Sequence, residues 1–388
     1  EDQEADIDFK ILCILTRSEH ADIDAVLRAL LHSWASTGKD DLDNMPPVWE
    51  DIEKYGLAPF FWEKIAQTFG YKSEEPALKS LLIRLFVSDF AARLKGVNVP
   101  KSLEHFVLNH TSPSNIVVFM DQWRDSQTYN PSYDVLSDSV AEEIHLRNYL
   151  VDMDLDALRD VMTFLEVEKR IASSLRDLIL QSFSMLNMEK IGEIVTVRQN
   201  GHWASDKMAD TSYAPRSAFH ALYNALYYAG ALADLKNREN NALKAKNASA
   251  FYEAYTNHLY KYDQIYRHYC HAEETARAHV GDILKTLSDK IEDLYLNWYQ
   301  DEMALEWNRH LDPDNGGLLN EWKLPEVPNQ YEFYKRYVHP ILNMGDNRKV
   351  FVIISDALRY EAAEEITRSL NGDYRIKADL GSQLGVLP

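Results

Sequence analysis

The sequence is poor in cysteine and has no long apolar run. Its two cysteines, Cys13 and Cys270, are too few and too far apart for a disulfide framework, which favours a reducing compartment. No run of apolar residues approaches the roughly 20 that a membrane span needs, and no signal peptide is recognisable. We therefore expect a cytoplasmic protein without a membrane partner.

Basic residues are also scarce. The 388 residues include 41 Lys and Arg against 61 Asp and Glu, which gives a formal net charge of −20. Because phosphate backbones are bound by clustered Lys and Arg, this excess of acid argues against a broad nucleic-acid surface but leaves room for a local basic groove. Contact with nucleic acid is thus not indicated by the charge, and stays open only through a complex with other proteins.

Most of the chain carries the apolar spacing of amphipathic helices. Asp22 or Asp24 is suited to start one helix, and Pro59 and Gly70 are suited to start and stop another. Residues 217–311 contain no proline, and two seams with a spacing of three and four residues predict a long helical hairpin there. The seams are Tyr252, Tyr255, Leu259, Tyr262, Tyr266 and Tyr269, and then Leu284, Leu287, Ile291, Leu294 and Trp298.

Residues 192–215 are less regular than their surroundings. A short strand is expected at 194–197, which is rich in β-branched residues. Arg198, His202 and Trp203 follow it as candidates for a ligand contact. A packed loop is the favoured alternative, because Trp usually lies in a core or an interface.

The stretch 349–374 carries the most chemical information. Residues 350–354 form a continuous apolar run, which is typical of a strand buried on both faces of a parallel sheet. Asp356 follows it, then a helical pattern from Ala357, and then a second candidate strand at 374–380. In open α/β sheets ligands gather at the carboxyl ends of the strands, so Asp356 is a candidate functional acid.

Several kinds of chemistry use an acid in that position. A nucleoside triphosphatase would need a Gly-rich phosphate loop, which is missing, and a dehalogenase-type site would need a second acid where Leu358 stands. A phosphate-accepting regulator domain would need further acids on an earlier strand. A metal-binding acid of a hydrolase remains, with one bland alternative: Ser355 and Asp356 could simply cap the helix that follows.

Residues 354–361, Ile-Ser-Asp-Ala-Leu-Arg-Tyr-Glu, resemble the signature of the PglZ family of bacteriophage-exclusion (BREX) systems, in its type A, BREX-1 form. The tail at 378–388 resembles the same family. The resemblance implies an alkaline-phosphatase-like α/β domain that acts as a metal-dependent phosphatase or phosphodiesterase. It further implies that Asp356 ligates a divalent metal, usually zinc, in the intact protein. Arg359 becomes a candidate for orienting phosphate, the alternative being a surface arginine paired with Asp356 or Glu361.

The resemblance also places the Thr or Ser nucleophile and the other metal ligands beyond Pro388. We therefore expect a fragment truncated inside the hydrolase domain, inactive by itself and without a bound metal. The helical part is expected to dock other BREX-system proteins. The alternative is a non-catalytic helical scaffold in which Asp356 is only a cap.

The predicted fold is mainly α-helical, followed by the first strand-helix-strand of an α/β alkaline-phosphatase-like domain. We expect an N-terminal helical domain at 1–130, a second helical domain with the hairpin at 131–322, a linker at 323–347, and the incomplete hydrolase domain at 348–388.

Overall fold

The structure is a computed structural model that describes residues 4–36, 42–108, 113–239, 243–315, 317–345, 348–356 and 358–385. It confirms a mainly helical fold. None of the helices in these ranges combines the length and the apolar character that crossing a membrane demands.

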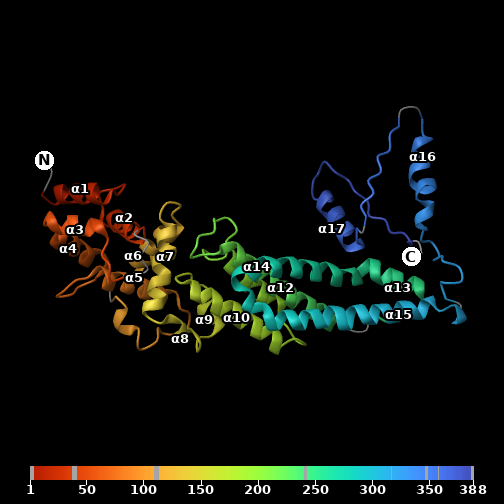
Figure 1. The fold of residues 1–388 in the computed structure, drawn as a ribbon, viewed down its shortest axis with the longest axis horizontal. Helices are drawn as coiled ribbons and strands as arrows, with labels where there is room; N and C mark the ends of the chain where they lie inside the picture. Colours follow the sequence, from red (N-terminus) through yellow and green to blue (C-terminus); the bar gives the residue numbers. More distant parts are fainter. Residues whose placement is uncertain are drawn as a thin grey trace. The chain divides into compact units, whose positions relative to one another are not determined.

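The chain divides into two compact units (Figure 1). The first comprises Glu1–Leu178, Glu189–Leu226 and Glu273–Leu284, and the second comprises Ile179–Met188, Tyr227–Ala272 and Lys285–Pro388. The division into four parts expected from the sequence stays a prediction.

The helices that belong mainly to the first unit are α1 Glu4–Thr16, α2 Ile23–Ala35, α3 Pro47–Lys54, α4 Ala58–Phe69, α5 Leu78–Arg93, the 3-10 turn η1 Glu104–Phe106, α6 Pro113–Asp125, α7 Asn130–Glu143, α8 Leu146–Leu150, α9 Leu155–Leu158, α10 Leu165–Gln181 and α11 Met188–Gln199. The helix α12 Arg216–Arg238 is shared, since the first unit ends at Leu226 and the second resumes at Tyr227.

Those that belong mainly to the second unit are α13 Ala248–Ala254, the π-helical η2 Tyr255–Leu259, α14 Tyr260–Glu292, the π-helical η3 Asp293–Gln300, α15 Asp301–Leu311, the 3-10 turns η4 Pro313–Asn315 and η5 Gln330–Glu332, the π-helical η6 Tyr334–Val338, α16 His339–Leu342 and α17 Tyr360–Asn371.

The helix ends of the first unit follow the signals in the sequence. Asp22 caps α2, its side chain accepting a hydrogen bond from the Ala25 backbone N–H at 2.8 Å. Gly70 ends α4 with φ of 75°, a left-handed conformation that glycine adopts without steric cost. Asp22 is one of the two acids that the sequence offered for the helix start, and Gly70 is the predicted stop.

An aromatic cluster forms the core where α5, α6 and α7 meet. Phe86, Trp123, Tyr133 and Phe164 are fully buried, and the Phe86 ring lies 5.2 Å from the Tyr133 ring and 5.5 Å from the Phe164 ring. Burying aromatic side chains of this size is a large part of what stabilises a domain. This core fixes α7, which carries the buried acid discussed below.

The predicted helical hairpin is present. Its first limb runs through α13, η2 and α14 as far as Val280, where φ is −137° and ψ is 16°, and its second limb runs through the rest of α14, η3 and α15. In the second unit the Tyr262 ring stacks on Tyr299 at 4.5 Å, and the Tyr266 ring stacks on Tyr295 at 3.7 Å. The tyrosine seam of one limb therefore faces the second limb, as predicted.

The strand expected at 194–197 is wrong, because these residues lie in α11. The buried positions of α11 are Ile191, Ile194, Val195 and Arg198, which share one helical face. A short β-branched run is ambiguous by itself, and here the core contact along that face decides for a helix.

The two strands expected at 350–354 and 374–380 are not formed either. Within the described ranges the structure has no β-ladder, and an isolated parallel bridge joins Asn329 to Leu384. Ile353 is 92% exposed and Ile354 is 89% exposed. A strand needs a neighbouring strand for its backbone hydrogen bonds, and no described segment supplies one.

The helix of the predicted strand-helix-strand unit is present as α17. It begins at Tyr360, whereas the sequence placed its start at Ala357, which lies outside the described residues. The mainly α-helical prediction is thus confirmed, and the α/β part is represented by its helix alone.

Candidate functional site

The candidate metal ligand Asp356 lies in the non-helical segment before α17, and its side chain is exposed to solvent. Arg359 occupies the N-cap position of α17, which was expected for Ser355 or Asp356. Its side chain forms no capping hydrogen bond with the helix. The expectation that Ser355 or Asp356 serves as a helix cap is therefore wrong. The metal role of Asp356 stays a prediction.

Arg359 points to a partner that the sequence did not suggest. Its Nη2 donates to Asp263 Oδ1 on α14 at 2.6 Å and to the Tyr295 hydroxyl at 3.2 Å. The expected pairing with Asp356 or Glu361 is wrong, because the fold brings Asp263 of α14 within hydrogen-bond distance of the Arg359 guanidinium. Its role in orienting phosphate stays a prediction, and in this structure its guanidinium is engaged by an acid.

Asp263 is surrounded by phenol groups from two π-helical segments. Tyr295 donates to its Oδ1 at 2.6 Å, Tyr255 donates to its Oδ2 at 2.8 Å, and the Tyr299 hydroxyl lies 3.4 Å from the same Oδ2. Tyr255 belongs to η2, and Tyr295 and Tyr299 belong to η3. π-helical turns widen the helix locally and are frequent at functional sites, and here they turn three phenols toward one carboxylate.

The phenols of this cluster remain protonated donors. Burial raises the pKa of Tyr255, Tyr295 and Tyr299 above the ordinary value of 10.0, and interaction with Asp263 raises it further. The three phenols are hydrogen-bond donors to Asp263, and the guanidinium of Arg359 is the cationic partner of the same carboxylate.

A second ion pair joins the same two helices. Arg267 on α14 donates to Glu361 through Nε at 3.0 Å and through Nη2 at 2.9 Å, and its Nη2 also bonds Glu365. The two-point geometry matches the planar fork of arginine to a carboxylate. Asp263 and Arg267 went unnoticed in the sequence, where opposite charges four residues apart indicate a pair within one helix.

The tail that resembles the PglZ family is held in the second unit through Leu384. This side chain is buried with Leu318 and Leu324. Its backbone N–H donates to the Pro328 carbonyl at 2.9 Å, and the Trp322 Nε1 donates to the Gly385 carbonyl at 2.6 Å. The tail is thus held by the non-helical segment 318–328, whereas α17 is held by α14.

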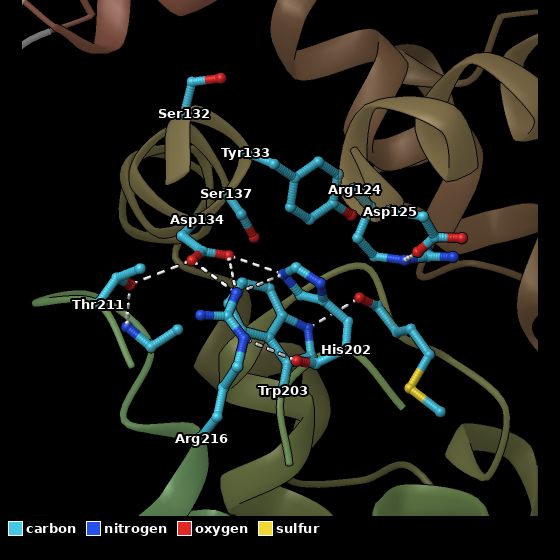
Figure 2. A network of polar contacts seen from close by, with 12 residues as sticks. Arg124, Asp125, Ser132, Tyr133, Asp134, Ser137, His202, Trp203, Thr211 and Arg216 are labelled. Carbon is cyan, nitrogen blue, oxygen red and sulfur yellow. Dashed lines mark hydrogen bonds and ion pairs between the residues drawn. The ribbon is translucent and has the colours of Figure 1, made fainter. Parts of the chain in front are cut away.

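The first unit contains a separate buried network, centred on Asp134 of α7 (Figure 2). Arg216 Nη2 donates to both Asp134 oxygens at 2.9 and 2.7 Å, and Thr211 donates to Oδ2 at 3.1 Å. His202 Nε2 lies 2.7 Å from Oδ1. Burial lowers the pKa of His202, which favours the neutral imidazole.

Residues 198–203 pack in the core of the first unit. Arg198 is fully buried and forms an ion pair with Glu168, whose carboxylate also accepts from the Tyr223 hydroxyl. Trp203 is buried and donates to the Met162 carbonyl at 2.8 Å. The packed interpretation of Arg198, His202 and Trp203 is therefore confirmed, although their partners lie 30 to 68 residues away in sequence.

The described residues do not form a complete metal centre. Within the ranges given above, no group of three or more His, Cys, Asp or Glu side chains is placed to hold a metal ion. A carboxylate such as Asp356 suits zinc as one ligand, but a catalytic zinc site takes three protein ligands. No catalytic step is therefore derived from this part of the chain.

Comparison with known proteins identifies the C-terminal stretch. Residues 333–388, which include Asp356, Arg359 and Glu361, match the family model described as the BREX system PglZ alkaline phosphatase-like domain. No solved structure matches the chain.

Two relatives match over nearly the whole chain. The alkaline phosphatase-like protein BrxZ of Escherichia coli O9:H4 (strain HS) is 29% identical over 389 residues, which cover 100% of this chain and 44% of that protein. The alkaline phosphatase-like protein PglZ of Bacillus cereus (strain H3081.97) is 26% identical over 385 residues, 99% of this chain and 42% of that protein. The chain thus spans less than half the length of these curated relatives. Both comparisons point the same way: residues 333–388 match the PglZ domain family of BREX systems, and the chain along its length is similar to the proteins named BrxZ and PglZ.

Proposed function

We propose that this chain is the part of a PglZ-family phage-defence protein that joins a helical arm to a metal-dependent hydrolase domain of the phosphatase or phosphodiesterase kind. The observation that carries the proposal is the match of residues 333–388 to the alkaline phosphatase-like domain, with Asp356 two residues after the end of the apolar run 350–354. Both relatives are named alkaline phosphatase-like proteins, which supports the same assignment.

In this proposal Asp356 holds a divalent metal, with zinc as our choice. When bound, such a metal neutralises phosphoryl oxygens and activates a hydroxyl nucleophile. The side chain of Asp356 is open to solvent, as a ligand awaiting further partners would be. No described residue is assigned as the nucleophile, and one carboxylate cannot hold a catalytic metal, so residues 1–388 by themselves are expected to be inactive.

The apolar run 350–354 supports a sheet that is completed by further polypeptide. Its residues are largely exposed here, including Ile353 and Ile354, and contiguous exposed apolar surface usually marks an unmet contact. The relatives are more than twice as long as the chain, so additional strands are available in proteins of this family. We propose that this run becomes a buried parallel strand with Asp356 at its carboxyl end.

The helical part is proposed to dock other BREX-system proteins in the cytoplasm. The match of residues 333–388 to a domain family of the BREX system supports this role.

The hydrolase proposal is tested in a polypeptide that spans the full length of the relatives. Hydrolysis of bis-p-nitrophenyl phosphate and of p-nitrophenyl phosphate is measured with zinc and after chelation, for the unaltered protein, Asp356→Ala and Asp373→Ala. Asp373 is an exposed acid in the same matched stretch and serves as the control. We expect metal-dependent hydrolysis that is lost in Asp356→Ala and kept in Asp373→Ala; equal activity of the two variants would overturn the assignment of Asp356.

A non-catalytic helical scaffold is the second candidate. It is favoured by the placement of Asp356 in a non-helical segment without companion ligands among the described residues. The same experiment separates the two candidates, since a scaffold would hydrolyse neither ester at any metal concentration.

A further inference from the structure

The first turn of α17 is tied to α14 by two ion pairs of opposite polarity. Arg359 of α17 reaches Asp263 of α14, and Arg267 of α14 reaches Glu361 of α17. In both pairs the acid is buried, the Asp263 side chain being 4% exposed and the Glu361 side chain 1% exposed. Each helix therefore contributes one buried acid and one arginine that crosses to the other helix.

This arrangement selects one register. Asp263 and Arg267 are one helical turn apart on α14, and Arg359 and Glu361 lie at the start of α17. Sliding α17 by one turn along α14 would bring Arg359 against Arg267, and reversing its direction would bring Glu361 against Asp263. Like charges in contact repel each other, so the charge pattern itself disfavours both alternatives.

Neutral hydrogen bonds support the same register. Gln264 Nε2 donates to the Glu361 carbonyl at 3.3 Å and to Glu364 Oε2 at 3.1 Å. The Tyr360 hydroxyl donates to the Thr256 carbonyl at 3.1 Å. Glu361 is also an acid in the first turn of its helix, where the helix dipole favours negative charge.

We propose that Asp263, Arg267, Arg359 and Glu361 form a clamp that fixes the register of α17 on the helical hairpin, so that this face of α14 is the docking surface for α17 of the matched stretch. The clamp fixes Arg359 on α14. Because Asp356 precedes Arg359 by three residues, the length of the chain keeps the Asp356 Cα within about 11 Å of the Arg359 Cα. The clamp does not depend on the hydrolase assignment, because it concerns how two parts of one chain are joined.

The first test is a double-mutant cycle in the 388-residue chain. Hydrogen exchange of the α17 amides is followed by mass spectrometry for Arg267→Ala, Glu361→Gln and the double variant. We expect each single change to lower protection of α17 about tenfold or more, and the double variant to lose no more than the more severe single change. Unchanged protection in the single variants, or losses that multiply in the double variant, would overturn the clamp.

The second test separates register from overall charge. Arg359→Glu combined with Glu361→Arg leaves the net charge of α17 unchanged but reverses its polarity. The clamp predicts that protection of α17 falls about tenfold or more, whereas simple attraction between α17 and the hairpin predicts no loss. Lys261→Glu, a charge reversal at an exposed site of α14, is the control and should leave α17 protected.

Helix content measured by circular dichroism shows whether each variant folds. If Arg267→Ala fails to fold, Arg267→Lys replaces it, since it keeps the charge and loses the two-point bond. Its expected result is a loss of α17 protection smaller than that of Glu361→Gln, and protection equal to that of the unaltered chain would count against the clamp.

Discussion

The guanidinium of Arg359 lies 2.6 Å from the carboxylate of Asp263, a residue 96 positions earlier in the chain. Arg359 lies in the stretch that matches the PglZ domain family, yet its guanidinium binds an acid of the helical hairpin. Because Asp263 also accepts bonds from Tyr255 and Tyr295, the arginine completes a polar cluster that is closed on its other sides. A residue of the matched stretch thus holds that stretch to the helical hairpin.

Removing the arginine should destabilise the second unit. Arg359→Ala leaves Asp263 without its cationic partner, and we expect a loss of about 2 to 3 kcal/mol, the range for a hydrogen bond to a charged group that is left unmade. The measurement is the thermal unfolding of the second unit, followed by hydrogen exchange of the hairpin. Arg336→Ala breaks the exposed pair with Glu332 and should cost less than about 1 kcal/mol. Equal effects of the two variants would contradict the structural role of Arg359.

The buried pair of the first unit should be more costly to break. Arg198→Met leaves Glu168 as an uncompensated charge in the core, where both side chains are fully buried, and we expect a loss of about 3 to 5 kcal/mol. Arg147→Met removes an exposed partner of Glu166 and should cost less than about 1 kcal/mol. Urea unfolding of both variants measures the difference. A cost for Arg198→Met near that of Arg147→Met would show that Arg198 is not buried as described.

His202 should make the stability of the first unit depend on pH. Burial lowers its pKa below the ordinary 6.5, so the unfolded chain takes up a proton that the folded chain does not. The free energy of unfolding should therefore fall as the pH drops below about 6.5, by up to about 1.4 kcal/mol per pH unit until the pH reaches the folded-state pKa.

The contribution of His202 is isolated by comparing slopes. Urea unfolding between pH 5 and pH 7.5 should show a flatter pH dependence for His202→Gln than for the unaltered chain. His279→Gln, at an exposed position of α14, should keep the original slope. If His202→Gln and His279→Gln behave alike, His202 titrates normally and the buried network of Figure 2 is wrong.

The exposed apolar run gives a prediction that depends on chain length. Ile353→Asp should leave the thermal midpoint of the 388-residue chain unchanged, because this side chain touches little here. In a polypeptide of the relatives' length the same change should destabilise the matched domain by several kcal/mol, roughly the cost of burying an unpaired charge. Ile14→Asp, at an exposed isoleucine of α1, is the control and should be mild in both lengths. A mild effect of Ile353→Asp in the longer polypeptide would argue against a buried strand.

The sequence predicted those features that depend on nearby residues. The cap at Asp22 and the stop at Gly70 are signals read within a few positions, and the tyrosine seam is a periodic pattern within one helix. The run 194–197 was misjudged because its composition favours a strand, whereas the helical face it shares with Ile191 and Arg198 is visible only once a core is present.

The site was less predictable than the helices. Asp356 and Arg359 stood out because they belong to a recognisable motif, but their partners did not. Asp263, Arg267 and the three phenols come from a distant stretch, and their spacing is equally consistent with a solvated helix surface. Which charges meet is decided by how α17 packs on α14, and that information is spread over some 100 residues of chain between them.

Asp356 is proposed to ligate a metal at the end of a parallel strand. The most direct test of this proposal is a crystal structure of a polypeptide of the relatives' length grown with zinc, with anomalous scattering measured at the zinc edge. The account predicts a zinc peak about 2.0 to 2.2 Å from an Asp356 carboxylate oxygen, with residues 350–354 paired in a parallel sheet. A structure in which residues 350–354 remain unpaired, or in which zinc binds elsewhere and Asp356 faces solvent, would contradict it.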